Sequence, residues 1–237
     1  MEDIYASDYV KRLFDSMAGS YERMNYITSF GFSIRWRKQF IRALGDSSAD
    51  IQVIDLLSGL GENWTMLTNQ FPNARFTALD FSARMCQISQ QKYGNRPGIT
   101  FRILHQDVLQ NNLSANQYDV ITCAYGLKTF NKEQLSKLAG EVCRILKPGG
   151  RFTFIEVSKP RNKLLLFFYR LYLKHTIPIL GKLFLGNPDD YRMLWTYTEK
   201  FGDASAVQEI FQRYPLDVRF DSYFFGCATG ISGIKRH

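Results

Sequence analysis

The first part of the chain carries its apolar residues on one side of a helix. They recur every three or four positions, the spacing that places side chains on a single face: Val10, Leu13, Phe14, Met17, Tyr21 and Met24. The sequence therefore predicts an amphipathic helix over residues 10–24. The aromatic and basic stretch that follows predicts a second helix over residues 30–44.

From about residue 50 the pattern changes to short apolar runs that alternate with helical segments. The runs predict strands at residues 51–57, 74–80, 99–104, 118–124 and 151–157. Helices are predicted at residues 82–93, with Ser82 as the cap, and at 135–146, where the KPGG sequence at 147–150 ends the helix. A helix at 204–214 and β segments at 216–225 and 227–234 follow. This alternation predicts parallel strands joined by right-handed crossovers.

Length and composition indicate one folded domain. The chain has 237 residues, of which 45% are hydrophobic and 22% charged, which suits a single α/β core. Its four cysteines form no C-x-x-C pair, so we expect neither a disulfide framework nor a bound metal. The first residues lack the basic-then-apolar order of a signal peptide, and no apolar run is long enough to span a bilayer. These features predict a cytoplasmic protein.

The positive charge is concentrated in two segments. The formal net charge is +8; residues 23–42 contain five basic and no acidic side chains, and residues 161–200 contain seven basic and three acidic ones. Such a surface suits an anionic membrane, a nucleic acid or an acidic substrate, or is simply a solvated basic face. No RNA- or DNA-reading motif accompanies the charge, so we expect no nucleic-acid partner.

An acid and a glycine turn follow the first predicted strand. Asp55 precedes Gly59 and Gly61, whose missing side chains let the backbone pass close to a ligand. No third glycine completes a dinucleotide-binding pattern, and no lysine–serine pair follows as in a phosphate-binding loop. An acid at this place repels phosphate, but Asp55 or Glu62 can balance an ammonium and a sulfonium. The turn therefore predicts a site for S-adenosylmethionine (SAM).

Two further acids follow the next two predicted strands. Asp80 ends the second strand, where a carboxylate can accept hydrogen bonds from both ribose hydroxyls, and Asp107 follows the third, where it can accept one from the adenine amino group. Ligands of open parallel sheets bind at the carboxyl ends of the strands. We therefore expect Asp55, Asp80 and Asp107 to surround one ligand, although each could instead cap a helix or turn.

Beyond these residues, the sequence resembles the UbiE-type C-methyltransferases of quinone biosynthesis along nearly its whole length. The resemblance rests on VKRLFDSMA at 10–18, SFG at 29–31, YGL at 125–127, RILKPGGR at 144–151, IEVSKP at 155–160 and DYR at 190–192. The KPGG part is common to class I methyltransferases, whereas the amino-terminal block and IEVSKP are specific. The family transfers a methyl group from SAM to a ring carbon of a prenylated phenol or naphthol.

The resemblance implies an α/β, Rossmann-like class I methyltransferase fold. Its sheet would have seven mostly parallel strands with an antiparallel last strand. Residues 1–45 would form a helical lid, 50–160 the SAM-binding core, 161–200 a helical insertion on the substrate side and 201–237 the last helix and strands. The implied cofactor contacts, with Tyr125 beside the transferred methyl, are Asp55, Gly59, Leu60, Gly61, Asp80, Phe81, Asp107, Val108, Ala124 and Tyr125.

Three departures from the family pattern lie near the implied site. Leu60 stands where the glycine turn usually has threonine, and Tyr197 where a serine is usual. The segment usually reading F-G-L-R-N is YGLKT at 125–129, so Lys128 replaces the planar fork of arginine with a point charge. These differences concern the methyl acceptor more than the cofactor.

Methylation of a ring carbon requires that the acceptor phenol lose its proton. His175 is a candidate general base because an imidazole titrates near neutral pH. Lys128 is a candidate for stabilising the phenolate, and Tyr21, on the expected lid helix, is a third catalytic candidate. Each has a structural alternative: His175 as a side chain extending from an apolar helix, Lys128 as a surface lysine, and Tyr21 as part of the apolar stripe.

The segment at 163–174 is apolar on nearly all sides and bordered by basic residues. A buried helix has the same pattern, but so does a wall for a lipophilic tail that docks on an anionic membrane. The sequence thus favours a SAM-dependent C-methyltransferase of a quinone precursor. Two alternatives stay open: a methyltransferase (C-, N- or O-) of a specialised natural product, and a non-catalytic SAM-binding, membrane-associated accessory protein. A homodimer also stays open.

Overall fold

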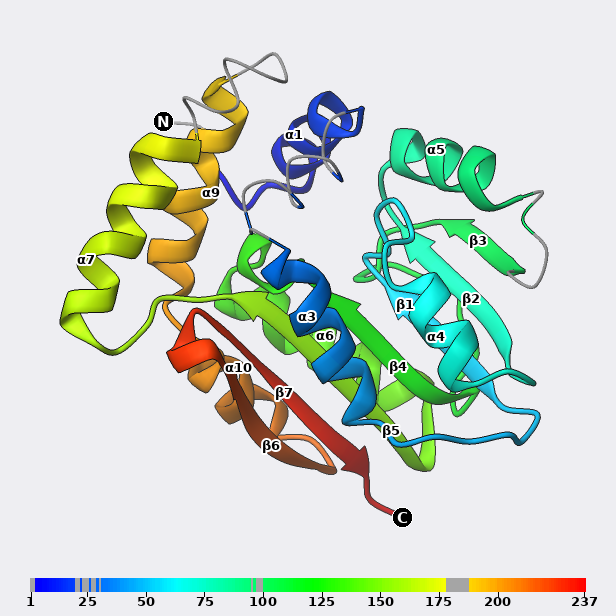
Figure 1. The fold of residues 1–237 in the computed structure, drawn as a ribbon. Coiled ribbons are helices and arrows are strands. Elements are labelled where there is room, and N and C mark those ends of the chain that lie inside the picture. Colours follow the sequence, from blue (N-terminus) through cyan, green and yellow to red (C-terminus); the bar gives the residue numbers. More distant parts are fainter. Residues whose placement is uncertain are drawn as a thin grey trace.

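A seven-stranded sheet forms the centre of the computed structural model, which describes residues 3–19, 22, 26, 29, 31–94, 96, 100–177 and 188–237. The strand order is β3-β2-β1-β4-β5-β7-β6 (Figure 1). Only β7 runs against the others, pairing antiparallel with both β5 and β6. This arrangement confirms the predicted fold class. The strands are β1 (Gln52–Leu56), β2 (Arg75–Asp80), β3 (Phe101–His105), β4 (Tyr118–Ala124), β5 (Leu146–Val157), β6 (Leu216–Tyr223) and β7 (Ala228–Lys235).

Helices cover both faces of this sheet. On one face, α3 (Phe32–Arg42) and α4 (Trp64–Gln70) bury Trp36, Phe40, Leu67 and Phe71 against β1, β4 and β5. On the other face, α6 (Lys132–Ile145) and α10 (Ser205–Phe211) bury a larger apolar cluster that includes Phe152 and Phe154 of β5. Helix α5 (Ala83–Tyr93) joins the first layer through Tyr93, which packs against Trp64. Burial on both faces explains the continuous apolar runs of the central strands.

A separate group of helices lies over the carboxyl ends of the central strands (Figure 1). Helix α1 (Ser7–Met17) packs with α7 (Lys163–Leu171), with the π-helical turn η2 (Tyr172–Thr176) and with α9 (Pro188–Phe201). Met17, Leu173, Ile177 and Trp195 form the buried centre of this group. Helix α9 also contacts the short helix η1 (Leu127–Thr129), which directly follows β4. The amino-terminal helix and the insertion therefore lie together above one edge of the sheet.

Most predicted elements agree with the structure, and the differences have local causes. The Ser82 hydroxyl accepts the Met85 N–H and caps α5 as expected. The fifth strand was predicted from residue 151, but β5 begins at Leu146, since Leu146 pairs with Tyr118 before an irregularity shifts the register. Residues 147–150, which were expected to form a turn that leads into the strand, instead lie within β5, between the pairs Tyr118–Leu146 and Val120–Arg151. The left-handed φ of 75° at Gly149 belongs to this irregularity. Helix α1 ends at Met17, and residues 21 and 24 of the predicted helix lie outside the described residues.

Within the part of the chain that the structure describes, no helix is both long enough and apolar enough to cross a bilayer. In the same residues no three histidine, cysteine or acidic side chains gather in a way that could hold a metal ion.

Candidate active site

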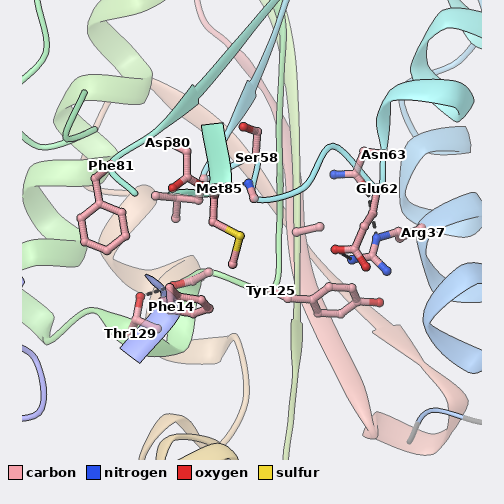
Figure 2. Close-up of a pocket in the computed structure, with 14 residues that line it drawn as sticks. Phe14, Arg37, Ser58, Glu62, Asn63, Asp80, Phe81, Met85, Tyr125 and Thr129 are labelled. Atoms are coloured by element: carbon pink, nitrogen blue, oxygen red, sulfur yellow. Dashed lines mark hydrogen bonds and ion pairs between the residues drawn. The ribbon is translucent and has the colours of Figure 1, made fainter. Parts of the chain in front are cut away.

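A pocket lies where β1, β2 and β4 end, under helix α1 (Figure 2). This is the edge at which open parallel sheets bind their ligands. The turn after β1, the end of β2 and the segment after β4 supply most of its wall, and α1, α3 and α5 supply one residue each. The lining residues are Phe14, Arg37, Leu57, Ser58, Gly59, Glu62, Asn63, Asp80, Phe81, Met85, Ala124, Tyr125, Gly126 and Thr129.

The turn after β1 has a backbone that requires glycine at two positions. Gly59 and Gly61 have φ angles of 52° and 76°, in the left-handed region. A Cβ at Gly61 would lie 2.7 Å from the Trp64 ring, whereas a Cβ at Gly59 would meet no atom within 4 Å. Because Gly59 lines the pocket, a side chain there would occupy the space of a ligand. The absence of a side chain at Gly61 therefore lets the turn pack against Trp64, and its absence at Gly59 leaves room for a bound group.

Asp80 holds the glycine turn to the start of α5. Its Oδ2 atom accepts the Gly59 N–H at 2.8 Å, and its Oδ1 atom accepts the Ser82 N–H at 2.9 Å. The side chain is buried, and this burial raises the pKa of the carboxyl to about 6 despite both hydrogen bonds. A carboxylate oxygen accepts more than one hydrogen bond. Asp80 can therefore bind ligand hydroxyls while it keeps the loop in place.

Asp55 lies beneath the pocket and is not among the residues that line it. It is fully buried in β1, where its carboxyl accepts hydrogen bonds from Thr122 Oγ1 at 2.7 Å and from Asn63 Nδ2 at 3.2 Å. Burial raises its pKa to about 7. The side chain thus supports Asn63, a lining residue, and its predicted contact with the cofactor is untested.

The raised pKa of Asp55 predicts a pH-dependent stability. Because the folded-state pKa (about 7) exceeds the ordinary 3.8, the folded chain binds this proton more tightly than the unfolded chain. The contribution of this bound proton to the free energy of unfolding is fully present below pH 3.8 and is lost as pH rises through about 7. We expect Asp55→Asn to remove a pH dependence on the order of a few kcal/mol between about pH 4 and 8, measured by urea unfolding. The same substitution at the exposed Asp217 should leave the pH dependence unchanged, and an unaltered profile in Asp55→Asn would contradict the assignment.

Arg37 forms the pocket wall opposite Asp80 (Figure 2). Its Nη2 atom donates to Glu62 Oε2 at 2.8 Å and its Nε atom to Asn63 Oδ1 at 3.2 Å. The guanidinium carbon lies 4.7 Å from the centroid of the Tyr125 ring. The sequence analysis counted Arg37 with a basic surface, but the residue is only 4% exposed. Its position in the buried stripe of α3 was the one available signal.

The predicted cofactor residues divide into two groups. Gly59, Asp80, Phe81, Ala124 and Tyr125 line the pocket. The others lie outside its lining: Asp55, Leu60, Gly61, Asp107 and Val108.

Two residues of the second group have clear local partners. Leu60 is buried with Ala18 and Met85, so the turn packs against the end of α1. Asp107 accepts the Leu109 N–H at 2.8 Å and thereby forms a turn of its own. Whether either residue contacts a cofactor stays a prediction.

The three catalytic candidates are found in different surroundings. Lys128 is buried, and its Nζ atom lies 2.7 Å from Oε1 of Glu156, a side chain with no exposed surface. Its neighbours Gly126 and Thr129 line the pocket. His175 is exposed on η2 and does not line the pocket. Tyr21 lies outside the described residues. Lys128 is therefore not the surface lysine that the sequence allowed, but its catalytic role is untested, as are the other two.

Comparisons with known proteins agree with this geometry. The profile of the ubiE/COQ5 methyltransferase family matches residues 2–235. The chain is 28% identical to the ubiquinone/menaquinone biosynthesis C-methyltransferase UbiE of Desulfotalea psychrophila, over 95% of this chain and 90% of that protein. It is 31% identical to the demethylmenaquinone methyltransferase of Thermus thermophilus, over 92% of this chain and 97% of that protein.

Solved structures agree on the fold. Magnesium protoporphyrin IX methyltransferase from Synechocystis, solved with bound S-adenosylhomocysteine, superposes with a TM-score of 0.64 at 16% identity, over 99% of this chain and 100% of that one. A SAM-dependent methyltransferase from Aquifex aeolicus has a TM-score of 0.57 at 17% identity, over 84% and 89% of the two chains. At this low identity the likeness shows the class I methyltransferase fold.

Proposed function

The chain belongs to the ubiE/COQ5 methyltransferase family, and from this premise we propose that it methylates a ring carbon of a lipophilic quinol of the ubiquinone or menaquinone type. That it is an enzyme and that it uses SAM follow from the family. The choice of acceptor is supported by the relatives, which are named as quinone-biosynthesis and demethylmenaquinone methyltransferases and match most of this chain. They favour this function over a specialised acceptor or a non-catalytic role.

The pocket residues fit SAM, which supplies, when bound, a methyl group already activated by the sulfonium charge. We propose that Asp80 accepts hydrogen bonds from the ribose hydroxyls and that the open side of Gly59 lets the ligand approach the backbone. Phe81, Ala124 and Tyr125 would line the same pocket. The other five predicted residues lie outside the lining and would support the pocket from behind or at its rim: Asp55, Leu60, Gly61, Asp107 and Val108. The buried carboxylate, which faces the pocket with a raised pKa, is the observation that carries this assignment.

The chain must also orient the acceptor and stabilise its phenolate. Methyl transfer to carbon requires that the ring carbon be held in line, at about 3–3.5 Å from the donor, and positioning of this kind supplies much of the acceleration. Phe14, Met85 and Tyr125 give the pocket apolar surface that excludes water. Lys128 is our proposal for the group that stabilises the phenolate, because the residues around it line the pocket. His175 and Tyr21 remain predictions for the proton acceptor.

We propose that the chain acts as one methyltransferase domain with its own lid. Helix α1 contributes Phe14 to the pocket and contacts α5 through a hydrogen bond between Asp15 and Ser82. The end of α1 also packs on Leu60 of the glycine turn. Residues 1–45 would thus cover the cofactor, 50–160 would bind it, 161–200 would face the acceptor and 201–237 would complete the sheet.

The proposed reaction is tested by incubating the protein with methyl-labelled SAM and a reduced demethylmenaquinone. We expect the label to enter the quinol fraction. No label in this acceptor or in a ubiquinone-type precursor, with SAM binding intact, would contradict the proposed acceptor.

For the same function, we propose that helix α7 makes a peripheral contact with a membrane. Its outward face carries four exposed apolar side chains, of which Phe168 is 59% exposed: Leu164, Phe167, Phe168 and Leu171. The exposed Lys163, Arg170 and Lys174 lie on the same segment, and residues 159–177 contain no acid. The inward face packs toward the pocket wall through Leu165 and Tyr169, in the cluster that contains Tyr125. Apolar side chains with a basic border suit an anionic bilayer.

A second copy of the chain is a poorer partner for this face, because dimerisation through it would bring two basic segments together. We therefore propose lipid as the partner of α7.

Vesicle binding tests this surface. The variant Phe167→Glu/Phe168→Glu is expected to bind phosphatidylglycerol vesicles about tenfold more weakly than the wild type in a sedimentation assay, because two inserted rings are lost. The control Ile234→Glu, which changes an exposed residue of β7, should bind like the wild type. Equal vesicle binding by all three proteins would contradict the proposal. So would a wild-type dimer that the double substitution makes monomeric without any vesicle binding by either protein.

A further inference from the structure

Two consecutive phenylalanines stand in the connection between β6 and β7. This connection, η3, spans Phe224–Gly226. All three of its residues have left-handed φ angles: 43° at Phe224, 54° at Phe225 and 87° at Gly226. Hairpin connections with such a backbone prefer glycine and asparagine, because a bulky side chain is strained in this conformation. The local backbone therefore does not explain why the chain has phenylalanine at both positions.

Burial does not explain these two rings either. Phe225 is 79% exposed, the largest exposed fraction of any large hydrophobic residue that the structure describes. Phe224 is 46% exposed and packs one side of its ring on Phe32 of α3, with the ring centroids 4.5 Å apart. An exposed aromatic ring on a strained backbone lowers stability without the return of burial. The explanation for Phe225 is therefore a partner outside the chain.

The connection between β6 and β7 lies beside the segment that leads into α7 (Figure 1). A Cβ at Gly226 would lie 3.6 Å from the Cα of Pro160. The carbonyl oxygen of Cys227 accepts the Ser158 N–H at 2.9 Å and the hydroxyl of Tyr169, on α7, at 3.3 Å. The exposed phenylalanines of the connection and those of α7 therefore belong to neighbouring elements.

The charge around this connection is positive or paired. Three segments that meet here contain no aspartate or glutamate: residues 31–45, 159–177 and 222–237. Two acids on adjoining segments, Asp203 and Asp221, are paired with Arg161 and Arg219, whose side chains are 79% and 68% exposed. An anionic lipid surface complements such a face, whereas a second copy of the chain would oppose it with the same basic segments.

We propose that the β6–β7 connection inserts the Phe225 ring, with Phe224 beside it, into the headgroup region of an anionic bilayer. This lipid contact is separate from that of α7, and it rests on the proposed function, because a bilayer is where a lipophilic quinol resides. A single helix that lies on a membrane can roll about its own axis, and a second contact prevents this. The inward side of α7, which packs toward Tyr125 through Tyr169, is then held at a fixed distance from the lipid.

Vesicle binding by Phe225→Asn tests the contact. We expect this variant to bind phosphatidylglycerol vesicles about tenfold more weakly than the wild type, because one inserted ring is lost. Its free energy of unfolding should equal or exceed that of the wild type, since asparagine suits a left-handed backbone. The matched control Ile234→Asn changes a residue that is 47% exposed near the other end of β7. It should bind vesicles like the wild type.

Fluorescence gives a readout that does not depend on α7. The three native tryptophans are each at most 6% exposed: Trp36, Trp64 and Trp195. In Phe225→Trp, phosphatidylglycerol that carries bromine on its acyl chains should quench the added fluorescence. In Ile234→Trp, the same vesicles should leave the added fluorescence unchanged.

Three results would overturn the inference. The first is wild-type vesicle affinity in Phe225→Asn, or an unquenched Phe225→Trp. The second is a loss of stability together with vesicle binding in Phe225→Asn, which would indicate a structural role. The third is a wild-type dimer that Phe225→Asn makes monomeric, without vesicle binding by either protein.

The proposed function is tested separately, by methylation of demethylmenaquinone in detergent micelles, where no bilayer is present. Methylation by the wild type in micelles, alongside any of these three results, leaves the proposed function standing. Absence of that methylation in a wild type that binds vesicles through Phe225 would contradict the proposed function and not the lipid contact.

Discussion

Asp80→Ala is expected to lower the affinity for SAM by a factor of at least about 100, since the two charge-assisted hydrogen bonds that we propose between Asp80 and the ribose would each be worth about 1.5–3 kcal/mol. The same change removes the acceptor for the Gly59 and Ser82 N–H groups. The glycine turn would then lose its link to α5, which adds to the effect. Asp80→Asn keeps the size of the side chain and should give a smaller loss. Isothermal titration with SAM measures both.

The control for this prediction is Asp217→Ala, at an aspartate exposed on β6 that pairs with Arg236. It should bind SAM with wild-type affinity. A Kd for Asp80→Ala within about threefold of the wild-type value, a difference under 1 kcal/mol, would show that the pocket at the end of β2 does not bind the ribose.

Lys128→Met is expected to lower the free energy of unfolding by about 3–5 kcal/mol, because it leaves the carboxylate of Glu156 buried without its partner. Glu156 accepts from both Nζ and the backbone N–H of Lys128, so the pair also fixes the segment after β4. The double variant Lys128→Met/Glu156→Gln should recover much of the loss, since it removes both charges. Urea unfolding of the wild type, of the single variants Lys128→Met and Glu156→Gln and of the double variant gives the coupling between the two residues.

An exposed ion pair supplies the matched control. Arg75 and Asp50 lie 2.6 Å apart with side chains 70% and 57% exposed, and Arg75→Met should leave the free energy of unfolding almost unchanged, because solvent screens an exposed ion pair. If Lys128→Met lowers the free energy of unfolding no more than Arg75→Met does, the buried pair does not stabilise the site.

In the folded Lys128→Met protein, a reduced kcat with unchanged SAM affinity would further support the role proposed for Lys128 at the phenolate.

The fold was predictable because its signals are local and repeated. Each central strand is an apolar run bounded by polar turns, and Ser82 caps α5 through a hydrogen bond three residues along the chain. The start of β5 was not predictable, because Leu146 is in the strand only through its pairing with Tyr118. A proline and two glycines at 148–150 indicate a turn locally, and in the structure they form the irregularity of β5 between the pairs Tyr118–Leu146 and Val120–Arg151.

The candidate site was predictable where it depends on the ends of strands and not where it depends on packing between distant elements. Asp80 was found because it ends an apolar run. Arg37 was missed because a sequence shows its charge but not that α3 turns it inward, 25 residues away from Glu62 along the chain. Asp55 was expected at the ligand but lies below the lining, since Thr122 and Asn63 hold it there.

The most direct measurement is the structure of the product formed from reduced demethylmenaquinone and SAM carrying an isotope-labelled methyl group. Mass spectrometry and NMR of the purified quinone locate the label. The proposed function predicts one labelled methyl on a ring carbon, formed by the wild type and not by Asp80→Ala. Label on an oxygen, or no labelled quinone from a wild-type protein that binds SAM, would contradict it.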